Sequence, residues 1–369
     1  MTTPAPDTAP PDPDGPAFEE RYPFLQGWAT YLGCLVAGLA LILLPLGEFL
    51  RAAGIFVTGV TVLILGGNWL VEGASALARR IGMSVLTIGL TIVAFGTSAP
   101  ELALNVIAAS NGNPDLCFGN IIGSNIANIG LVLGLGAILA PMALSERVRR
   151  ADMPWLIGTT IAFIALSLSG GLLLGRADLS VLDAAAWTRG SGIALLVLFA
   201  AVMFAWIRLE RQSMRKAKAE KAEDVLSHLG EEYIPHADLA HLEAIGPVTA
   251  VVLVVLGLGG LAGGGKLAEV GAVDLATIAG LSQAMIGLTI VALATSLPEV
   301  VTTIIASLKG RNDLAVGNVV GSNLFNMLLV MGVTATVAPV PVAPPYGLWD
   351  LGVMLAITVA LWVAAQLHG

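Results

Sequence analysis

One stretch of this chain occurs twice, and the repeat constrains the fold more than any other feature of the sequence. Residues 89–131 align with residues 287–329 at a constant offset of 198 without gaps, and 22 of the 43 positions are identical. A repeat of this length predicts two copies of one structural unit. The polar identities include Thr97 with Thr295, Ser98 with Ser296, Glu101 with Glu299, Asp115 with Asp313, Asn120 with Asn318, Ser124 with Ser322 and Asn128 with Asn326.

Both copies lie in apolar surroundings that are typical of a membrane protein. Hydrophobic residues make up 56% of the 369 residues and charged residues only 12%, against a usual charged share of about a quarter. Most apolar runs approach or exceed the roughly 18 to 20 residues that a helix needs to cross a bilayer. We therefore predict an all-α polytopic membrane protein with ten spans, at residues 28–47, 54–76, 84–110, 116–141, 154–175, 190–207, 246–264, 282–308, 314–339 and 347–366.

The spans are grouped into two halves by one long polar stretch. Residues 208–245 are highly charged at their start, and we expect them to form a cytoplasmic loop. The first repeat half is then 51–207 and the second is 246–369, with an extra helix at 28–50 before the first. Residues 1–27 are rich in Pro, Asp and Thr and are predicted to be a disordered tail.

Composition also excludes several classes of function. The net charge of −8 and the absence of a basic patch argue against nucleic-acid binding. Cys34 and Cys117 lie in or beside apolar segments, where a cysteine usually acts as a small hydrophobe. No intramembrane histidine motif or facing aspartate pair supports a protease. We expect a protein that is not an enzyme and that needs no cofactor.

Most lysines and arginines fall on one side of the predicted spans, and this sets the orientation. They cluster at 79–80, 147–150, 208–221 and 309–311, whereas two of the opposite loops, at 111–115 and 340–346, have none. Short cytoplasmic loops hold the positive excess. Both termini and the 208–245 loop are therefore predicted to be cytoplasmic, in a protein of the bacterial inner membrane.

The number of spans between the two copies predicts how they are related. Five crossings separate the start of the first copy from the start of the second, so the copies enter the membrane from opposite faces. Inverted repeats are the design of many secondary transporters, in which discontinuous helices form the binding site at the bilayer midplane. The sequence therefore predicts a transporter with its site between the repeats.

Spacing within each copy indicates what this site binds. Thr97, Ser98 and Glu101 stand at i, i+1 and i+4, on one side of a helical turn. Pro100 cannot bond the carbonyl of Gly96, so the helix should kink and free carbonyl oxygens. Oxygen ligands alone favour a hard cation such as Ca²⁺, because zinc and copper sites usually include His or Cys.

Two structural interpretations compete with this prediction. Each glutamate could serve only to hydrogen-bond across helices at a proline kink, but a carboxylate at bilayer depth costs about 2.5 to 3.5 kcal/mol and is usually functional. The glycine pairs Gly119 with Gly123 and Gly317 with Gly321 are typical of close helix packing rather than of ligand contact. We interpret them as packing that brings the ligand helices together. Glu72, near the end of its segment, is interpreted as an interfacial charge.

The repeats resemble a known family. GTSAPE with GNIIGSNIANIGLVLG, and ATSLPE with GNVVGSNLFNMLLVMG, are similar to the two alpha-repeats of the sodium/calcium exchanger family, within the calcium/cation antiporter superfamily. The resemblance implies an inverted five-plus-five helix fold with four cation sites in a diamond at midplane. It implies a calcium site between Glu101 and Glu299 with the carbonyls of Thr97 and Thr295. It implies sodium sites made by the carbonyl of Ala94 with Ser98, Glu101 and Ser124, and by the carbonyl of Ala292 with Thr295, Ser296, Glu299 and Ser322, with Asn128 and Asn326 lining the middle.

The chain departs from the family pattern in two places. Members often have Asp at one of the two central positions, whereas Asn128 and Asn326 are both amides here, so the stoichiometry stays open. The chain also has an extra helix at 28–47 before the usual first one and ends after the usual ninth. We expect the extra helix to pack where the tenth would lie.

The function expected from these features is antiport of Ca²⁺ against Na⁺ by alternating access. A Ca²⁺/H⁺ antiporter, in which protonation of the glutamates replaces sodium, is the first alternative, and a cation channel is the second. The expected partners are Ca²⁺ and Na⁺, with H⁺ as the alternative counter-ion, and the lipid bilayer. The oligomeric state, the affinity, the physiological direction and the role of the loop stay open.

Overall fold

The chain is almost entirely helical over the part that the structure describes. This computed structural model describes residues 28–140, 142, 144–173, 185–220, 242, 245–282, 285, 292–342 and 347–367. The predicted tail at 1–27 and most of the predicted loop at 208–245 lie outside the described residues, as does the start of the eighth predicted span.

The first half of the chain follows the predicted order of spans. Its elements are α2 (Trp28–Leu43), α3 (Glu48–Ile81), α4 (Val85–Ile88), η2 (Gly89–Val93), α5 (Ala94–Thr97), α6 (Ala99–Ser110), α7 (Pro114–Ala127), η3 (Asn128–Leu133), α8 (Gly134–Leu139), η4 (Val148–Asp152), α9 (Met153–Leu173), β1 (Ala186–Trp187) and α10 (Arg189–Glu220). The predicted sixth span ends at 207, whereas α10 runs on to Glu220 into the charged segment.

The second half repeats this order. Its elements are α12 (Pro247–Ile278), α14 (Ala292–Ala294), α15 (Leu297–Leu308), α16 (Asn312–Leu324), η6 (Phe325–Val330), α17 (Met331–Val337), β2 (Val340–Pro341) and α18 (Gly347–Leu367). β1 and β2 form a short antiparallel pair in which Ala186 lies opposite Pro341 and Trp187 opposite Val340. α12 continues well past 264, the predicted end of its span, and stops just before Gly280, whose positive φ of 82° suits glycine.

The count of ten spans stays a prediction. Within the described residues, seven helices are long and apolar enough to cross a membrane, and eight if the bent pair Val85–Thr97 and Ala99–Ser110 is one span. Two shorter apolar helices, Ala29–Leu43 and Leu297–Leu308, fall below that length.

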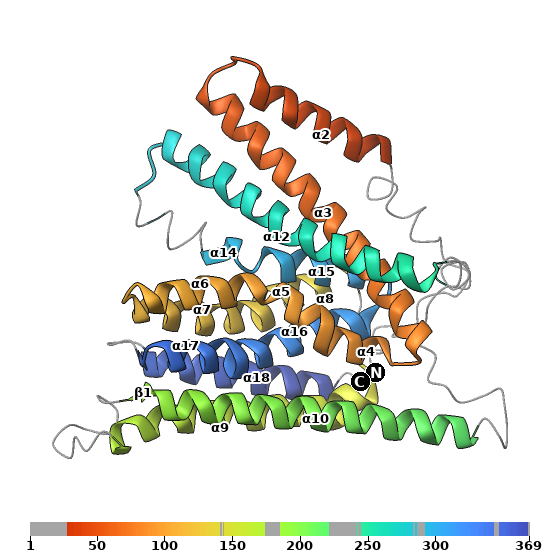
Figure 1. Cartoon of the computed structure of the whole chain (residues 1–369), viewed down its shortest axis with the longest axis vertical. Helices are drawn as coiled ribbons and strands as arrows, with labels where there is room; N and C mark the ends of the chain where they lie inside the picture. The colour runs from red at the N-terminus through yellow and green to blue at the C-terminus, as the bar shows by residue number, and fades with distance from the viewer. Residues whose placement is uncertain are drawn as a thin grey trace, which may run out of the picture.

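Two long helices, α3 and α12, pack antiparallel along a seam of glycines. Figure 1 shows them as an inclined pair at one edge of the molecule, with α9 and α10 at the opposite edge. Glycines recur every seven residues on both helices, and a Cβ at any of them would meet backbone atoms of the other helix; they are Gly59, Gly66 and Gly73 on α3, and Gly257, Gly264 and Gly271 on α12. Small residues allow this approach in membrane helices, so α3 and α12 form one tightly joined unit.

The core of the molecule is built around α16, η6 and α17. Within an 18-residue apolar stretch of this span 94% of the residues are buried, against 50% for such a stretch of the equivalent span α7, η3 and α8. α10 packs against α17 and η6, and α16 packs against η2 and α4. The predicted glycine packing is confirmed on α16, because a Cβ at Gly317 or Gly321 would meet backbone atoms of Leu86 or Leu90. It is not borne out on α7, where no described atom lies within 4 Å of a Cβ at Gly119 or Gly123.

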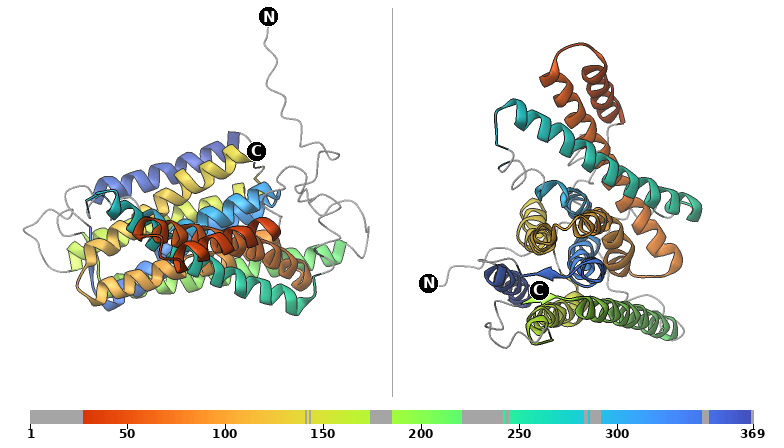
Figure 2. Two further views of the ribbon diagram at one scale, coloured as in Figure 1. Left: turned by 90° about the horizontal axis from the view of Figure 1, so that it is seen from above. Right: turned by 60° about the vertical axis from the view of Figure 1, so that its left-hand side comes forward.

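The position expected for the extra helix is wrong. α10 packs on the second repeat, so a tenth helix related to it by the repeat symmetry would pack on η3 and α8. The main contacts of α2 are instead with α3, where Gly38 lies against Gly54 and Thr58. Figures 1 and 2 show α2 on the outer side of α3. The apolar sequence of α2 predicted that it packs on another helix of the protein, but it does not specify which helix.

Candidate functional site

Both repeat motifs break a helix at their serine. α5 ends at Thr97 and α6 begins at Ala99, with a bend of 42° between the two parts, and Ser98 between them has φ −86° and ψ 1°. In the second repeat Ser296 has nearly the same backbone angles, φ −89° and ψ 1°. The kinks predicted from Pro100 and Pro298 are thereby confirmed.

The two motif glutamates lie buried at the starts of the helices that follow the breaks. Glu101 is in the first turn of α6 and Glu299 in the first turn of α15, and each is 1% exposed. Among the described residues, no basic side chain pairs with either carboxylate, and none of their four oxygens has a hydrogen bond of normal length and geometry. A buried carboxylate without a partner is costly, so this arrangement is suited to receive a cation.

Hydroxyl groups from both repeats surround the carboxylates. Thr97, Ser98 and Ser322 face Glu299, and Glu101 lies close enough to Glu299 for the two charges to repel each other. Ser124 and Ser296 are also buried, at 4% and 2% exposed. The site therefore joins the two motifs, with oxygen atoms as its polar groups.

The two repeats exchange equivalent contacts through their threonines. The Thr97 hydroxyl donates to Asn318 Oδ1 at 3.1 Å, and Asn120 Nδ2 donates to the Thr295 hydroxyl at 3.3 Å. Because 97 and 120 correspond to 295 and 318 at the repeat offset, one contact occurs twice with the repeats exchanged. This is the contact pattern expected of two inverted copies around an approximate two-fold axis.

The central asparagines differ between the repeats. Asn128 Nδ2 donates to Asn323 Oδ1 at 3.0 Å, and Asn323 Nδ2 donates to the Asn125 carbonyl at 3.2 Å. Asn326, the equivalent of Asn128, is fully buried, and neither of its side-chain polar atoms has a hydrogen-bond partner among the described residues. The free atoms of Asn326 are thus available to a ligand.

The backbone ligands implied by the family resemblance lie at the same breaks. The Ala94 carbonyl accepts the Ser98 amide at 3.0 Å and the Thr97 hydroxyl at 3.3 Å. Ala292 is the first residue of α14. Thr97 ends α5, and Thr295 lies between α14 and α15. The described residues contain no group of three or more His, Cys, Asp or Glu side chains that could hold a metal ion, so any cation here must also use neutral oxygens.

The sequence did not identify two buried residues, Asn105 and Thr303, that contact Asn120 and Asn318. Asn105 and Thr303 occupy equivalent positions but differ in type, so the comparison of repeats did not select them. Asn105 Nδ2 donates to the Glu101 carbonyl and to Asn120 Oδ1, both at 2.7 Å, whereas Asn318 Nδ2 donates to the Thr303 hydroxyl at 3.2 Å.

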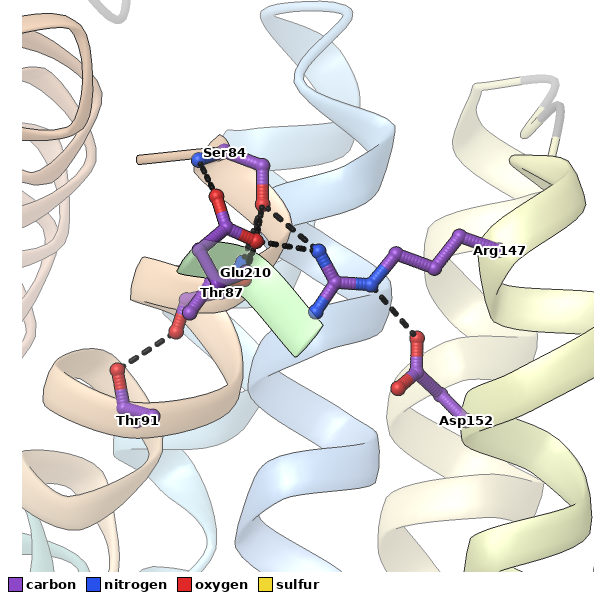
Figure 3. A network of polar contacts seen from close by, with 6 residues as sticks. All are labelled: Ser84, Thr87, Thr91, Arg147, Asp152 and Glu210. Carbon is purple, nitrogen blue, oxygen red and sulfur yellow. Dashed lines mark hydrogen bonds and ion pairs between the residues drawn. The ribbon is translucent and has the colours of Figure 1, made fainter. Parts of the chain in front are cut away.

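Two ionic clusters anchor the helices around this site. Glu210 of α10 accepts hydrogen bonds from the Ser84 amide, the Thr87 hydroxyl and Arg147 at 2.5 to 2.7 Å, and so fixes the start of α4 (Figure 3). Asp152 lies 3.8 Å from the same arginine.

The second cluster ties α3 to the loop between α15 and α16. Glu72 pairs with Lys309 at 2.5 Å and with Arg311 at 3.2 Å, and Arg311 also donates to the Val71 carbonyl at 3.0 Å. Glu72 is thus more than the interfacial charge expected from the sequence, because it holds the long helix against the core.

The chain is similar to known proteins in both sequence and structure. A family model described as sodium/calcium exchanger protein matches residues 51–208 and 249–367. The inner membrane protein YrbG of Escherichia coli strain K12 is 31% identical over 316 residues, covering 84% of this chain and 87% of YrbG. The sodium/calcium exchanger MaX1 of Methanosarcina acetivorans is 30% identical over 298 residues, covering 79% of this chain and 84% of MaX1. The solved structure of the sodium/calcium exchanger from Methanococcus jannaschii matches with a TM-score of 0.67 at 25% identity, over 85% of this chain and 89% of that one.

Proposed function

The chain is an integral membrane protein of the sodium/calcium exchanger family, and from this premise we propose that it exchanges Ca²⁺ for Na⁺ across a bacterial inner membrane. One observation carries the proposal: Glu101 and Glu299 are buried near each other between the repeats, hydroxyl groups face Glu299, and no basic side chain among the described residues pairs with either carboxylate. The names of MaX1 and of the Methanococcus jannaschii structure support sodium and calcium as the ions.

Calcium binding would use the part of the site that both repeats share. Ca²⁺ lies between Glu101 and Glu299 and takes backbone carbonyls from Thr97 and Thr295. Calcium prefers six to eight oxygen ligands, and carboxylates, carbonyls and water provide them. Both glutamates begin a helix, where the backbone dipole favours the carboxylate form.

Sodium would bind at two sites that share the same glutamates. The first takes the Ala94 carbonyl, Ser98 and Ser124 with Glu101. The second takes the Ala292 carbonyl, Thr295, Ser296 and Ser322 with Glu299. Asn128 and Asn326 line the space between the sites and add amide oxygens.

Exchange follows from competition for the two carboxylates. Their two negative charges are neutralised by one Ca²⁺ or by two Na⁺, whereas a site without cations keeps two uncompensated charges at bilayer depth. Such charges are costly there, so the site does not cross between its two access states empty. Each passage in one direction with Ca²⁺ therefore requires a return with Na⁺.

The movement between access states would involve α3 and α12. Their glycine seam holds them together as a pair, and this pair moves against the repeat core as one body. Glu72, Lys309 and Arg311 bridge the pair to the core, so this cluster has to rearrange in the movement. Ligands shift such an equilibrium only through their different affinities for the two states.

The test measures which gradient drives calcium. Purified protein is reconstituted in liposomes, and uptake of radioactive calcium is followed with an outward sodium gradient, with a pH gradient, and with neither. We expect uptake with the sodium gradient only. Uptake driven by the pH gradient alone would support the Ca²⁺/H⁺ antiporter instead, and uptake that needs neither gradient would support a channel.

The orientation is tested in spheroplasts and in inverted membrane vesicles. A protease-cleavable site in the 208–245 loop should be cut only from the side that is cytoplasmic in intact cells, with both termini on that side. Cutting of this loop from the periplasmic side of spheroplasts would overturn the orientation.

A further inference from the structure

The helix pair α3 and α12 follows the same repeat offset as the two motifs. The three seam glycines of α3 lie 198 residues before the three seam glycines of α12, as the motifs do. The offset therefore identifies equivalent positions on the pair and on its neighbours. They include Gly67 with Gly265, Glu72 with Val270, Ile305 with Ile107, Lys309 with Asn111, and Arg311 with Asn113.

The helix pair packs on α15 but not on α6, its equivalent. A Cβ at Gly67 of α3 would meet side chains of α15, among them Ile305, which is 3% exposed. A Cβ at Gly265 of α12 would have atoms of α3 and α15 as its three nearest neighbours, and none of α6. Ile107 of α6 is 60% exposed. The pair thus covers α15 and leaves α6 open.

The loops that follow α6 and α15 share one turn but differ in their contacts. The central glycines of the loops 111–113 and 309–311 have φ of 75° and 69°, so the backbones turn alike. The loop 111–113 is exposed throughout. In the other loop, Lys309 and Arg311 are buried against α3, where both pair with Glu72. The covered side is therefore also the side with the ion pairs.

The open side has no residues for an equivalent cluster. Val270 stands on α12 in the place of Glu72, and asparagines stand in the loop 111–113 in the places of both cations. None of these side chains is charged. If α12 packed on α6 as α3 now packs on α15, no equivalent ion pair would form.

We propose that Glu72, Lys309 and Arg311 form a one-sided lock, which holds α3 on α15 and favours the access state in which the α6 side is open. Inverted repeats change access as one part moves against the other, and in the opposite state α12 lies on α6 while α3 leaves α15. The loop 309–311 is on the face predicted to be cytoplasmic, so the lock closes that face. The inference rests on the proposed function, because it assumes alternating access.

Removing the anion of the lock should shift the balance between the two states. Arg311 also donates to the Val71 carbonyl at 3.0 Å, so leaving α3 separates a buried cation from two partners. Glu72→Gln removes the charge partner from the present state, and the opposite state has no such partner to lose. A buried charge left unpaired is strongly destabilising, so the population ratio should move toward the opposite state by at least about tenfold.

The experiment measures a distance across the open side. Spin labels are attached at Asn111→Cys and Asp274→Cys, which are exposed positions on the loop after α6 and on α12. Cys34 is replaced by alanine, and the fully buried Cys117 stays. Double electron–electron resonance on the purified protein then reports the distance at fixed sodium and calcium. With Glu72 present, one long distance should dominate, and Glu72→Gln should add a shorter one.

A second variant builds the pair on the other side. Val270→Glu with Asn113→Arg reproduces the Glu72–Arg311 pair by the repeat offset and leaves the natural cluster untouched, so it decides the matter even if Glu72→Gln fails to fold. It should also raise the share of the short distance. The control is Glu146→Gln, which removes an exposed pair with Arg150 at 3.0 Å and should leave the distances unchanged.

The distances report movement without transport. A shift to the short distance in the folded variants supports the lock even if the unchanged protein shows no sodium-driven calcium uptake in liposomes, a result that would remove only the proposed function. An unchanged or longer distance in Glu72→Gln or in Val270→Glu with Asn113→Arg would overturn the inference, as would an equal shift in Glu146→Gln.

Discussion

The two repeat spans α7–η3–α8 and α16–η6–α17 carry the same site residues in very different surroundings. Within an 18-residue apolar stretch of each span, 94% of the residues are buried in the second and 50% in the first. α10 covers the second, where a Cβ at Gly332 would meet Leu196 and Gly192, whereas no described atom lies within 4 Å of a Cβ at the equivalent Gly134. Ile138 on the first span is 81% exposed.

This contrast shows that the two repeats hold the same site residues although their outer neighbours differ. Some identical residues meet across the approximate two-fold axis, as Thr97 does with Asn318 and Asn120 with Thr295. Gly134 and Gly332 are also identical, yet among the described residues only Gly332 lies close to another helix. The charges around α3 and α12 differ between the repeats as well.

The largest expected difference between the repeats lies in these charges. Glu72 on α3 pairs with Lys309 and with the fully buried Arg311. The equivalent position on α12 is Val270, and the adjacent Glu269 pairs only with its own helix neighbour Lys266 within the described residues. Removing one partner of a buried ion pair costs about 3 to 5 kcal/mol, and an exposed pair is worth about 0 to 1 kcal/mol.

Glu72→Gln should therefore lower the midpoint of thermal unfolding in detergent by many degrees, while Glu269→Gln leaves it nearly unchanged. Equal effects of the two substitutions would show that Glu72 does not anchor α3 to the core.

A smaller difference is expected from packing of the spans themselves. Gly332→Leu inserts a side chain between α17 and α10, and overpacking of this kind costs about 1 to 3 kcal/mol. Gly134→Leu adds its side chain where the described structure leaves room and should change stability little. Thermal unfolding of both variants measures the difference, and a loss in Gly134→Leu as large as that in Gly332→Leu would mean that another helix covers α8.

The smallest difference concerns the two central asparagines. Asn128 donates to Asn323, so an aspartate at 128 would place a carboxylate against the oxygen that now accepts this bond. Asn326 has no such bond to lose. We expect Asn326→Asp to be about 1 kcal/mol more stable than Asn128→Asp, the contribution of one hydrogen bond. Unfolding of the two proteins in parallel tests this, and the reverse order of stability would contradict it.

Much of the site could be predicted from the sequence because polar residues in apolar spans are rare. Glu101 and Glu299 with their prolines indicated both the helix breaks and the place where the repeats meet. The seven-residue spacing of Gly59, Gly66 and Gly73 is a similar signal for the close packing of α3 on α12.

The other features depend on contacts between segments that are far apart in the chain. The hydrophobic periodicity of one segment does not specify which segment it contacts. An apolar helix such as α2 carries no mark of its neighbour, so its packing on α3 was predicted wrongly. Glu72 lies 237 residues from Lys309 in the chain, and nothing near either residue indicates the pair. Asn105 could not be identified from the repeat because its equivalent, Thr303, is a different residue type. The relation between the two is visible only in their contacts, of Asn105 with Asn120 and of Thr303 with Asn318.

The central claim is that the two motif glutamates together hold the transported calcium. Its most direct test is sodium-driven calcium uptake by liposomes containing Glu101→Gln, Glu299→Gln or, as a matched control on α12, Glu269→Gln. Both site variants should lose nearly all uptake, because either change leaves one negative charge for a divalent cation, and the control should keep it. Uptake that survives in either Glu101→Gln or Glu299→Gln would contradict the account.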